Sequence, residues 1–462
     1  MNRYLENIYA FAPHLLQNLG ITLFDFLSYS KRHGGRYRFW KDYYGSARQK
    51  PLVELQKMQN ELLREFLAYA VENSSFYANH YRGIDLSKIQ SVNDLQLLPV
   101  IDKKTILTNI DDFLTIPKNK AIHVVTGGTT GNSMGVFFTF EDIQKRWATL
   151  DSFREQFGYR FGEKTAWFSG KNLLTERDIR KNRYRKDDYL YNIRYYSTFH
   201  INESTARFYL EDLNHFRPRH LVGFPYCIFE LARMAKAKNI KIEFQPVTIF
   251  STAEALNPEH AKVMEEVFNC KVIDQYASSE GAPFINQCPH GNMHYELLSG
   301  VIEVVDENLN PADEGEILVT SFTTHGTPLI RYRIGDRVKL SNKKCDCPNC
   351  NPVVENLSGR NMDYVYSKER GKIFLPNISN TVKYARGVLA FQAIQKEVDC
   401  IIVKIVKDPG IYTEEDESLI LDEWRYRMGD KCGIDFEYVN DIPKEKSGKF
   451  LMIKNEIKHL ID

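Results

Sequence analysis

The sequence predicts an α/β (α+β) protein with a large N-terminal domain and a small C-terminal domain. Three observations lead to this prediction. Apolar residues recur at helical spacing over residues 52–77, short β-rich runs alternate with helical segments from His123 onward, and about a hundred residues of mixed strand and helix signals follow Gly359-Arg360. We expect the domains to span residues 1–360 and 361–462.

The large domain is predicted to hold mixed sheets covered by helices, with a small β-barrel subdomain. Residues 1–120 are expected to be mostly helical, because Leu55, Leu62 and Phe66 fall on one helical face. The runs VVTGG, VTIFSTAE and KVIDQYA predict strands, and the strong alternation over residues 300–340 predicts the barrel. The C-terminal piece reads as a separate α/β domain.

Composition indicates a soluble globular protein. The 462 residues are 43% hydrophobic and 13% aromatic, enough for a large domain plus a smaller one. The 61 basic and 60 acidic residues leave a net charge of +1, so no nucleic acid partner is expected. The N-terminus carries Arg3 and Glu6 without a long apolar run, and no uncharged stretch reaches membrane-spanning length. We expect a cytoplasmic protein; the sequence leaves its oligomeric state open.

Four short segments, in this order, carry the chemistry. They are TGGTTGNSMG at 126–135, DQYASSEG at 274–281, RYRIGD at 331–336 and PKEKSGK at 443–449. Each motif alone is common, but the ordered set is specific. The set resembles the adenylate-forming superfamily of acyl-CoA synthetases, amino-acid adenylation domains and luciferases, which activate carboxylic acids with ATP.

The first segment follows the apolar run 122–125 and is predicted to bind the β- and γ-phosphates of ATP. Its glycines let the backbone approach an anion, and its hydroxyl and amide groups can donate to phosphate oxygens. A Gly/Thr-rich hairpin turn is the alternative for this loop taken alone. The predicted nucleotide-binding residues are Thr126, Gly127, Gly128, Thr129, Thr130 and Gly131.

The two middle segments are predicted to bind the rest of the nucleotide. Glu280 is the predicted Mg²⁺ ligand and a catalytic residue, because a hard dication prefers carboxylate and phosphate oxygens. Tyr276 offers a ring face to adenine, and Ser279 can donate a hydrogen bond to the α-phosphate. Asp336 can accept hydrogen bonds from both ribose hydroxyls. A polar turn after a strand is the alternative for either segment alone.

Lys449 is the second predicted catalytic residue. Attack of a carboxylate on the α-phosphorus brings two anions together, and an ammonium group that bridges them stabilises the transition state. Lys444 and Lys446 in the same segment are interpreted as solvated charges. A surface lysine in a polar turn is the alternative for Lys449 itself.

The resemblance runs from Val124 to the C-terminus and is closest to the capsule-biosynthesis CapK-like group among phenylacetate-CoA ligase relatives. Ser133-Met134 stands where most acyl-CoA synthetases have Pro-Lys, which favours this branch. The resemblance implies that Arg360 begins a hinge and that the C-terminal domain is mobile. Met362 replaces the usual hinge aspartate, so the family's hinge details do not transfer directly.

The resemblance also implies which residues line the remaining parts of the site. Ala253 and Glu254 would border the adenine and ribose. The segment HLVGFPYC would line the acyl pocket, with Gly223, Phe224 and Tyr226 as the predicted substrate-binding residues. Core packing is the alternative for its aromatic side chains.

The cysteines give a separate signal. Thiols and imidazoles cluster at two places, and their spacing suits a four-coordinate structural Zn²⁺ better than a disulfide in a reducing cytosol. On the resemblance we assign Cys288, His294, Cys345 and Cys347 as ligands, and His290 and Cys350 stay open as substitutes. Cysteines that bind nothing are the alternative.

The predicted function is ATP-dependent activation of a small carboxylic acid. The acid and ATP give an acyl-adenylate and pyrophosphate, after which a thiol such as that of CoA displaces AMP. We expect the product to serve polysaccharide or capsule biosynthesis. One alternative is an amide synthetase that couples the adenylate to an amine of an amino acid or sugar. The other is an inactive relative that acts as a zinc-stabilised binding protein.

Overall fold

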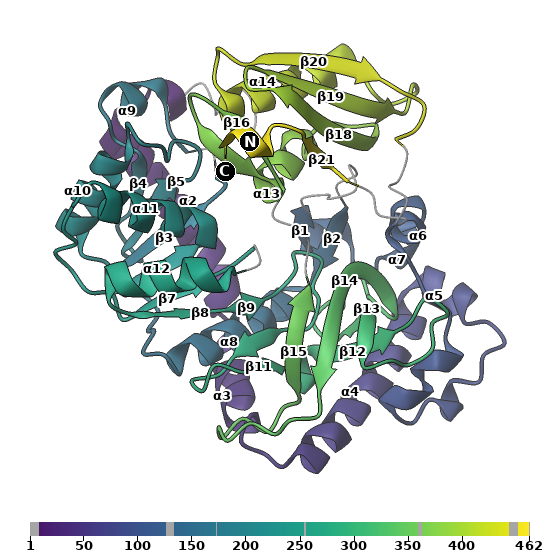
Figure 1. The fold of residues 1–462 in the computed structure, drawn as a ribbon. Helices are drawn as coiled ribbons and strands as arrows, with labels where there is room; N and C mark the ends of the chain where they lie inside the picture. The colour runs from purple at the N-terminus through teal and green to yellow at the C-terminus, as the bar shows by residue number, and fades with distance from the viewer. Residues whose placement is uncertain are drawn as a thin grey trace.

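A computed structural model describes residues 9–125, 134–171, 173–253, 256–358, 363–442 and 451–461. Within these residues the strands form five sheets, with two larger sheets and their helices in the first three quarters of the chain and a smaller group at the C-terminus (Figure 1). The predicted α/β (α+β) class is confirmed.

The described residues before Ala121 are mostly helical. The periodic segment 52–77 is two helices, because α4 ends at Asn73 and the Ser74 hydroxyl caps α5 by accepting a hydrogen bond from the Tyr77 N–H at 3.4 Å. The segments are α2 (His14–His33), α3 (Tyr37–Ala47), α4 (Leu52–Asn73), α5 (Ser75–His80), α6 (Lys103–Thr108) and α7 (Ile110–Phe113), with short 3₁₀ turns η1 (Leu86–Lys88), η2 (Val92–Leu97) and η3 (Lys118–Lys120).

A six-stranded sheet follows, in the order β4-β5-β3-β6-β7-β8. Its strands are β3 (Thr165–Ser169), β4 (Arg185–Asp188), β5 (Ile193–Ser197), β6 (His220–Gly223), β7 (Thr248–Ser251) and β8 (Lys271–Ile273), and only the edge strand β4 is antiparallel to its neighbour. Its helices are α8 (Phe140–Glu155), α9 (Glu176–Arg180), α10 (Ala206–Phe216), α11 (Pro225–Ala237) and α12 (Pro258–Phe268). The chain reaches β5 on one side of β3 and β6 on the other. Such a switch point is where parallel sheets bind ligands, outside the carboxyl ends of the strands.

The second large sheet has seven antiparallel strands in the order β12-β13-β14-β15-β11-β10-β9. Its elements are β9 (Gln275–Tyr276), β10 (Ile285–Gln287), β11 (Met293–Tyr295), η4 (Leu297–Ser299), β12 (Gly300–Val305), β13 (Glu314–Ser321), β14 (Tyr332–Ser341) and β15 (Val353–Ser358). Burial alternates along the first seven residues of β14, as the sequence pattern predicts. The alternating region 300–340 therefore does form strands.

A short hairpin stands next to this sheet. Strands β1 (Ile122–Val125) and β2 (Gly135–Phe138) pair antiparallel, with Val125 opposite Gly135. The Phe137 N–H donates to Thr327 Oγ1 at 3.0 Å, which ties the hairpin to the segment after β13. The predicted phosphate loop connects these two strands, but residues 126–133 lie outside the described ones.

The C-terminal part has its own sheets and its own core, which surrounds Phe391 and Trp424. The four-stranded sheet has the order β20-β19-β18-β21, and β16 pairs with β17. The elements are β16 (Tyr364–Ser367), β17 (Gly371–Phe374), α13 (Leu375–Ser379), η5 (Asn380–Val382), β18 (Val388–Glu397), β19 (Cys400–Lys407), α14 (Glu414–Met428), β20 (Gly433–Tyr438), β21 (Ile453–Asn455) and α15 (Lys458–Ile461). A separate core is consistent with the predicted C-terminal domain; its boundary at residue 361 and its mobility stay predictions.

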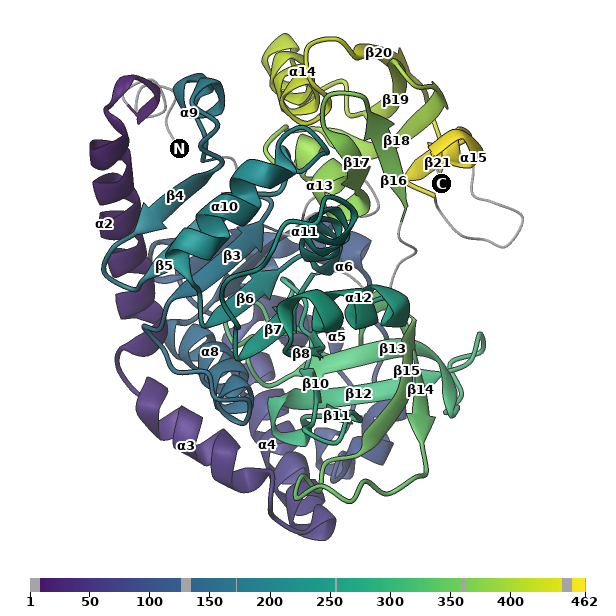
Figure 2. The ribbon, with the colours of Figure 1, turned by 60° about the vertical axis from the view of Figure 1, so that its left-hand side comes forward.

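The C-terminal part lies against the helices of the six-stranded sheet, as Figure 2 shows for α13 and α11. The Tyr226 and Phe374 rings lie 4.0 Å apart between centroids, and Asn202 Nδ2 donates to the Glu369 carbonyl at 3.0 Å. These contacts join the carboxyl-end side of the sheet to the C-terminal part.

Among the described helices, none combines the length and apolar character needed to cross a bilayer.

Candidate functional site

Two of the predicted nucleotide residues meet directly. The Tyr276 hydroxyl on β9 donates a hydrogen bond to Asp336 Oδ2 on β14 at 2.7 Å. Four strand spacings separate β9 from β14 in the sheet, which would be about 19 Å in a flat sheet. The sheet must therefore curl strongly, as the predicted small barrel requires. The contact places the proposed adenine platform beside the proposed ribose acceptor.

Glu280 lies four residues beyond Tyr276 in a tight turn. The side chain of Glu280 is half-buried, and within the described residues its carboxylate accepts no hydrogen bond. Gly281 has a φ of +108°, and a Cβ there would lie 2.4 Å from Thr324 Cγ2, so the turn accepts only glycine at this point. Ser279, the predicted α-phosphate donor, is exposed in the same turn.

Arg146 on α8 fixes this turn, and the sequence analysis missed it. Its guanidinium donates to the carbonyls of Ser278 at 3.0 Å and Ala282 at 3.2 Å, and to Thr323 Oγ1 at 3.1 Å. Burial lowers the pKa of Arg146 to about 10, while the nearby carboxylates of Asp142 and Glu280 act in the opposite direction. The group therefore stays charged at neutral pH and braces the backbone on both sides of Glu280.

We expect Arg146→Lys to weaken adenylate formation roughly 10- to 30-fold. The ammonium group of a lysine cannot make all three hydrogen bonds of the planar guanidinium, and each lost hydrogen bond is worth about 1 kcal/mol. Pyrophosphate exchange at varied Mg-ATP measures it, with the loss expected in the KM for Mg-ATP. Arg180→Lys, at an exposed arginine of α9, is the control. A variant with lower thermal stability but unchanged KM would show that Arg146 serves the fold alone.

The carboxyl ends of β6 and β7 meet beside this region. The Thr252 N–H donates to the Gly223 carbonyl at 3.0 Å, and Ser251 Oγ donates to Asp274 Oδ1 at 2.5 Å. Burial raises the pKa of Asp274 above its ordinary value, although the bonds from Ser251 and the Gln275 N–H oppose the shift. Ala253 has a φ of +69°, a strained left-handed conformation that is typical of functional turns.

The predicted acyl-pocket residues lie at the start of α11. A Cβ on Gly223 would lie 2.0 Å from the Phe168 carbonyl oxygen, so the strand end packs tightly there. Phe224 is buried in the core of the six-stranded sheet, which supports the core-packing alternative for its ring. Tyr226 is half-buried and faces Phe374 of the C-terminal part. Of the three, Tyr226 is the one placed between the two parts of the chain.

Several predicted site residues cannot be placed. The phosphate-loop residues, Glu254, Arg360 and Lys449 lie outside the described residues. Their roles stay predictions from the sequence.

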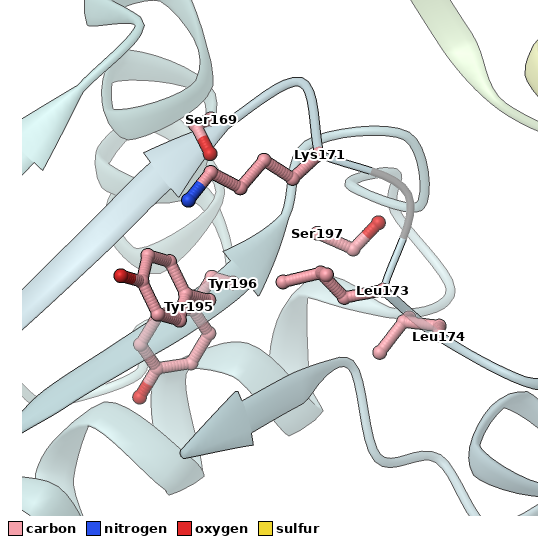
Figure 3. Close-up of a pocket in the computed structure, with 7 residues that line it drawn as sticks. All are labelled: Ser169, Lys171, Leu173, Leu174, Tyr195, Tyr196 and Ser197. Atoms are coloured by element: carbon pink, nitrogen blue, oxygen red, sulfur yellow. The ribbon is translucent and has the colours of Figure 1, made fainter. Parts of the chain in front are cut away.

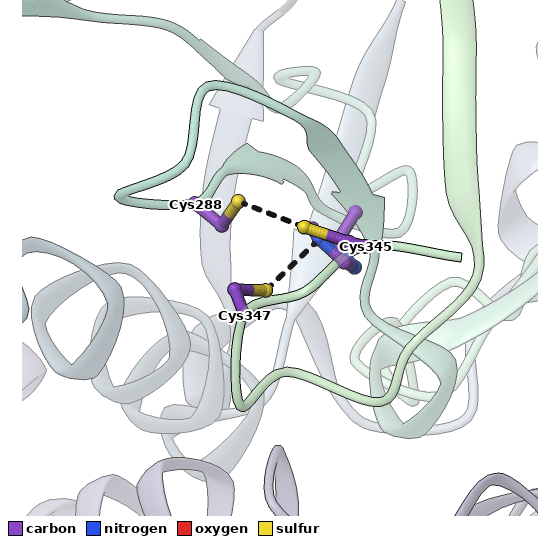
Figure 4. A group of neighbouring side chains, drawn as sticks. Cys288, Cys345 and Cys347 are labelled. Atoms are coloured by element: carbon purple, nitrogen blue, oxygen red, sulfur yellow. Dashed lines mark hydrogen bonds between the residues drawn. The ribbon is translucent and has the colours of Figure 1, made fainter. Parts of the chain in front are cut away.

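The four cysteine and histidine side chains assigned to a metal lie together, and Figure 4 shows the three cysteines. The ligand atoms of Cys288, His294, Cys345 and Cys347 all lie within 4.8 Å of one another. Cys288 Sγ is 3.7 Å from Cys345 Sγ, and Cys347 Sγ is 3.4 Å from His294 Nε2. The two substitutes are not part of this group: Cys350 is exposed, and so is His290.

These distances fit a tetrahedral ion. With Zn–S bonds of about 2.3 Å and Zn–N bonds of about 2.0 Å, two donors at tetrahedral corners lie about 3.5 to 3.8 Å apart. The His294 ring is held by its other nitrogen, because Nδ1 lies 2.8 Å from the Asn351 carbonyl, and this leaves Nε2 to face the thiols. Three thiols and one imidazole suit a structural zinc site, because no position is left for water.

A small pocket opens at the carboxyl ends of β3 and β5 (Figure 3). Lys171 crosses it, with its ammonium 4.5 Å from the centre of the Tyr195 ring. The pocket shares none of its lining residues with the predicted nucleotide or acyl sites.

Solved structures identify the fold class. Residues covering 89% of this chain superpose on 92% of a 2-hydroxyisobutyryl-CoA ligase in complex with 2-HIB-AMP and CoA in the thioesterification state, with a TM-score of 0.60 and 16% identity. The postadenylation state of that ligase in complex with R3-HIB-AMP gives a TM-score of 0.56 at 16% identity, over 90% of this chain and 92% of that one. The chain thus has the fold of adenylate-forming acid–CoA ligases.

Sequence comparison identifies the family. The chain is 33% identical to Protein CapK of Staphylococcus aureus over 462 aligned residues, covering 98% of this chain and 100% of the relative. A family model described as the CapK C-terminal domain matches residues 365–456. The chain therefore belongs to the CapK family. It is also 31% identical to indoleacetate–lysine synthetase of Pseudomonas savastanoi over 140 residues, covering 29% of this chain and 33% of that one.

Proposed function

We propose that the protein activates a carboxylic acid by adenylation and then transfers the acyl group to a thiol such as that of CoA. In the first step a carboxylate oxygen attacks the α-phosphorus of ATP, and pyrophosphate leaves. In the second step the thiol sulfur attacks the acyl carbonyl carbon, AMP leaves, and the thiol proton goes to solvent. We place the product, on family resemblance, in polysaccharide or capsule biosynthesis.

The observation that carries this proposal is the pairing of Tyr276 with Asp336 beside the Glu280 turn. The Tyr276 hydroxyl orients the carboxylate of Asp336, which would accept hydrogen bonds from the ribose hydroxyls. The Tyr276 ring then offers a flat face next to the ribose position. Glu280 lies four residues beyond Tyr276, in the turn that follows β9.

Glu280 is the residue that would hold Mg²⁺, because its half-buried carboxylate is a hard oxygen donor that no described residue occupies. The ion would neutralise phosphate charge when bound. Lys449 would bridge the attacking carboxylate and the α-phosphate, and Arg146 keeps the Glu280 turn in place.

The acceptor has two candidates. The superposition on a ligase solved with CoA supports a thiol. The local similarity to indoleacetate–lysine synthetase supports an amine, which would make the product an amide. The same first half-reaction serves both.

A two-stage assay tests the proposal. A panel of carboxylic acids is first screened for acid-dependent exchange of pyrophosphate into ATP, and each active acid is then offered CoA, amino acids or amino sugars one at a time. A thioester or amide is identified by mass spectrometry. No exchange with any acid by a folded protein would favour a binding protein without catalysis.

We expect Glu280→Gln to weaken Mg-ATP use, because a neutral amide is a poor ligand for a hard dication. Pyrophosphate exchange should fall about 10- to 100-fold at limiting Mg²⁺ and recover in part at high Mg²⁺. Glu259→Gln, at an exposed glutamate of α12, is the matched control. Unchanged exchange at limiting Mg²⁺ would leave Glu280 as a surface carboxylate only.

A further inference from the structure

Helix α2 (His14–His33) presents its apolar side to solvent. Leu23 is 61% exposed and Phe24 is 65% exposed. The exposed apolar residues follow helical spacing and cover about half of the helix circumference. This outer face of α2 consists of Leu15, Leu16, Leu19, Leu23, Phe24, Phe26 and Leu27.

The inner side of the same helix is mixed, because Ile21 and Tyr29 pack in a small core while its other buried residues are polar. Asn18 Nδ2 donates to Asp187 Oδ2 at 3.2 Å and to the Tyr189 hydroxyl at 2.8 Å, and the Tyr195 hydroxyl donates to Asp25 Oδ2 at 2.7 Å. These bonds fix the rotation of α2 against β4 and β5, so the helix cannot turn its leucines inward without leaving buried polar groups unpaired. Figure 2 shows α2 at the margin of the molecule, beside β4. The outward position of the leucines is thus built into the fold.

Basic residues follow the apolar face in the last turn of α2 and the first turn of α3. Asp25 is the one carboxylate within α2, and it is buried. Lys31 follows Leu27 by four residues, with its ammonium 5.8 Å from the centre of the Phe140 ring at the start of α8, and Arg38 is exposed in the first turn of α3. Within the described residues neither Lys31 nor Arg38 has an acidic partner. Phe39 follows Arg38 in the chain, and its ring is exposed. Exposed aromatic rings are common in protein segments that lie at a membrane interface.

We propose that the outer face of α2 binds the surface of a membrane that contains anionic phospholipid. An apolar helix face that lies in the interfacial plane, flanked by cations, gains from acyl-chain contact and from attraction to phosphate headgroups. A second copy of the chain fits this face less well. It would bring two such faces together, and neither carries an exposed carboxylate within α2 to pair with the cations.

Vesicle co-sedimentation of the full chain tests the proposal. The protein should sediment with vesicles of phosphatidylcholine and phosphatidylglycerol in equal parts, and the bound fraction should fall with added salt and on phosphatidylcholine alone. The triple variant Leu19→Gln, Leu23→Gln and Leu27→Gln should bind at least about tenfold more weakly, because it removes three apolar contacts with the lipid. Lys31→Glu with Arg38→Glu should lose the preference for anionic vesicles.

The matched control changes three exposed leucines elsewhere, with Leu97→Gln, Leu389→Gln and Leu460→Gln. It should bind like the unaltered protein. Circular dichroism and pyrophosphate exchange should show that all variants fold and keep their activity, since α2 lies outside the site. The proposal is overturned if the unaltered protein ignores anionic vesicles, or if the α2 variant binds them equally well. Self-association in analytical ultracentrifugation that the α2 variant abolishes, without vesicle binding, would assign the face to a second copy instead.

Discussion

Lys449→Ala should lower acid-dependent pyrophosphate exchange about a thousandfold while leaving folding and ATP binding largely intact. The ammonium of Lys449 is expected to contact the attacking carboxylate and the α-phosphate chiefly in the transition state, where two anions approach each other. Removing a contact that exists mainly in the transition state lowers the rate of the chemical step more than it weakens substrate binding. Equilibrium binding of ATP and the melting temperature, measured on the same sample, separate these two effects.

The matched controls lie in the same segment. Lys444→Ala and Lys446→Ala remove an identical charge, and both variants should keep near-normal exchange because these residues are interpreted as solvated. If all three variants lose activity equally, the segment contributes a general positive field. If the Lys449→Ala variant keeps near-normal exchange, Lys449 has no part in the chemistry.

The motifs predict those parts of the proposed nucleotide site that are local in sequence. Tyr276, Glu280 and Asp336 each lie in a short segment whose residue types and order carry a chemical meaning. The structure adds their arrangement: the curled sheet brings Tyr276 within 2.7 Å of Asp336. Periodicity also predicted strands in the region 300–340, because alternation of buried and exposed residues is a direct consequence of the pleat.

Arg146 shows what such reasoning could not find. It acts on the turn from helix α8, 132 residues before Ser278, and most of its acceptors are backbone carbonyls. Every residue type has a backbone carbonyl, so the acceptors of Arg146 cannot be recognised from the sequence. No motif therefore indicates the contact between Arg146 and the Glu280 turn. Only the three-dimensional packing of α8 against the turn reveals it.

Helix α2 shows a second limit. Its leucines have the spacing of a core-facing helix, so the pattern alone would place them inward. Polar contacts of Asn18 and Asp25 with β4 and β5 decide the orientation instead. Those partners lie about 170 residues away, beyond the reach of any local pattern.

Zinc is the second large effect that we expect. Cys347→Ser should remove most of the bound metal and lower the melting temperature by roughly 5 to 10 °C, because an incomplete ligand set binds zinc weakly and zinc binding contributes directly to folding free energy. The ion would join the β10–β11 hairpin, which carries Cys288 and His294, to the segment between β14 and β15 that carries Cys345 and Cys347. Elemental analysis of protein purified without added metal, together with thermal denaturation, measures both quantities.

Cys350→Ser is the matched control for this site. Cys350 lies three residues beyond Cys347, but it is exposed and is not in the group of close ligand atoms. Its replacement should leave zinc content and stability unchanged, which distinguishes loss of a ligand from loss of any thiol in the loop. Activity in Cys347→Ser should fall only as the folded fraction falls, because four protein ligands leave no open position for chemistry. Less than about a tenth of an equivalent of zinc in the well-folded unaltered protein would rule out a zinc site at these residues.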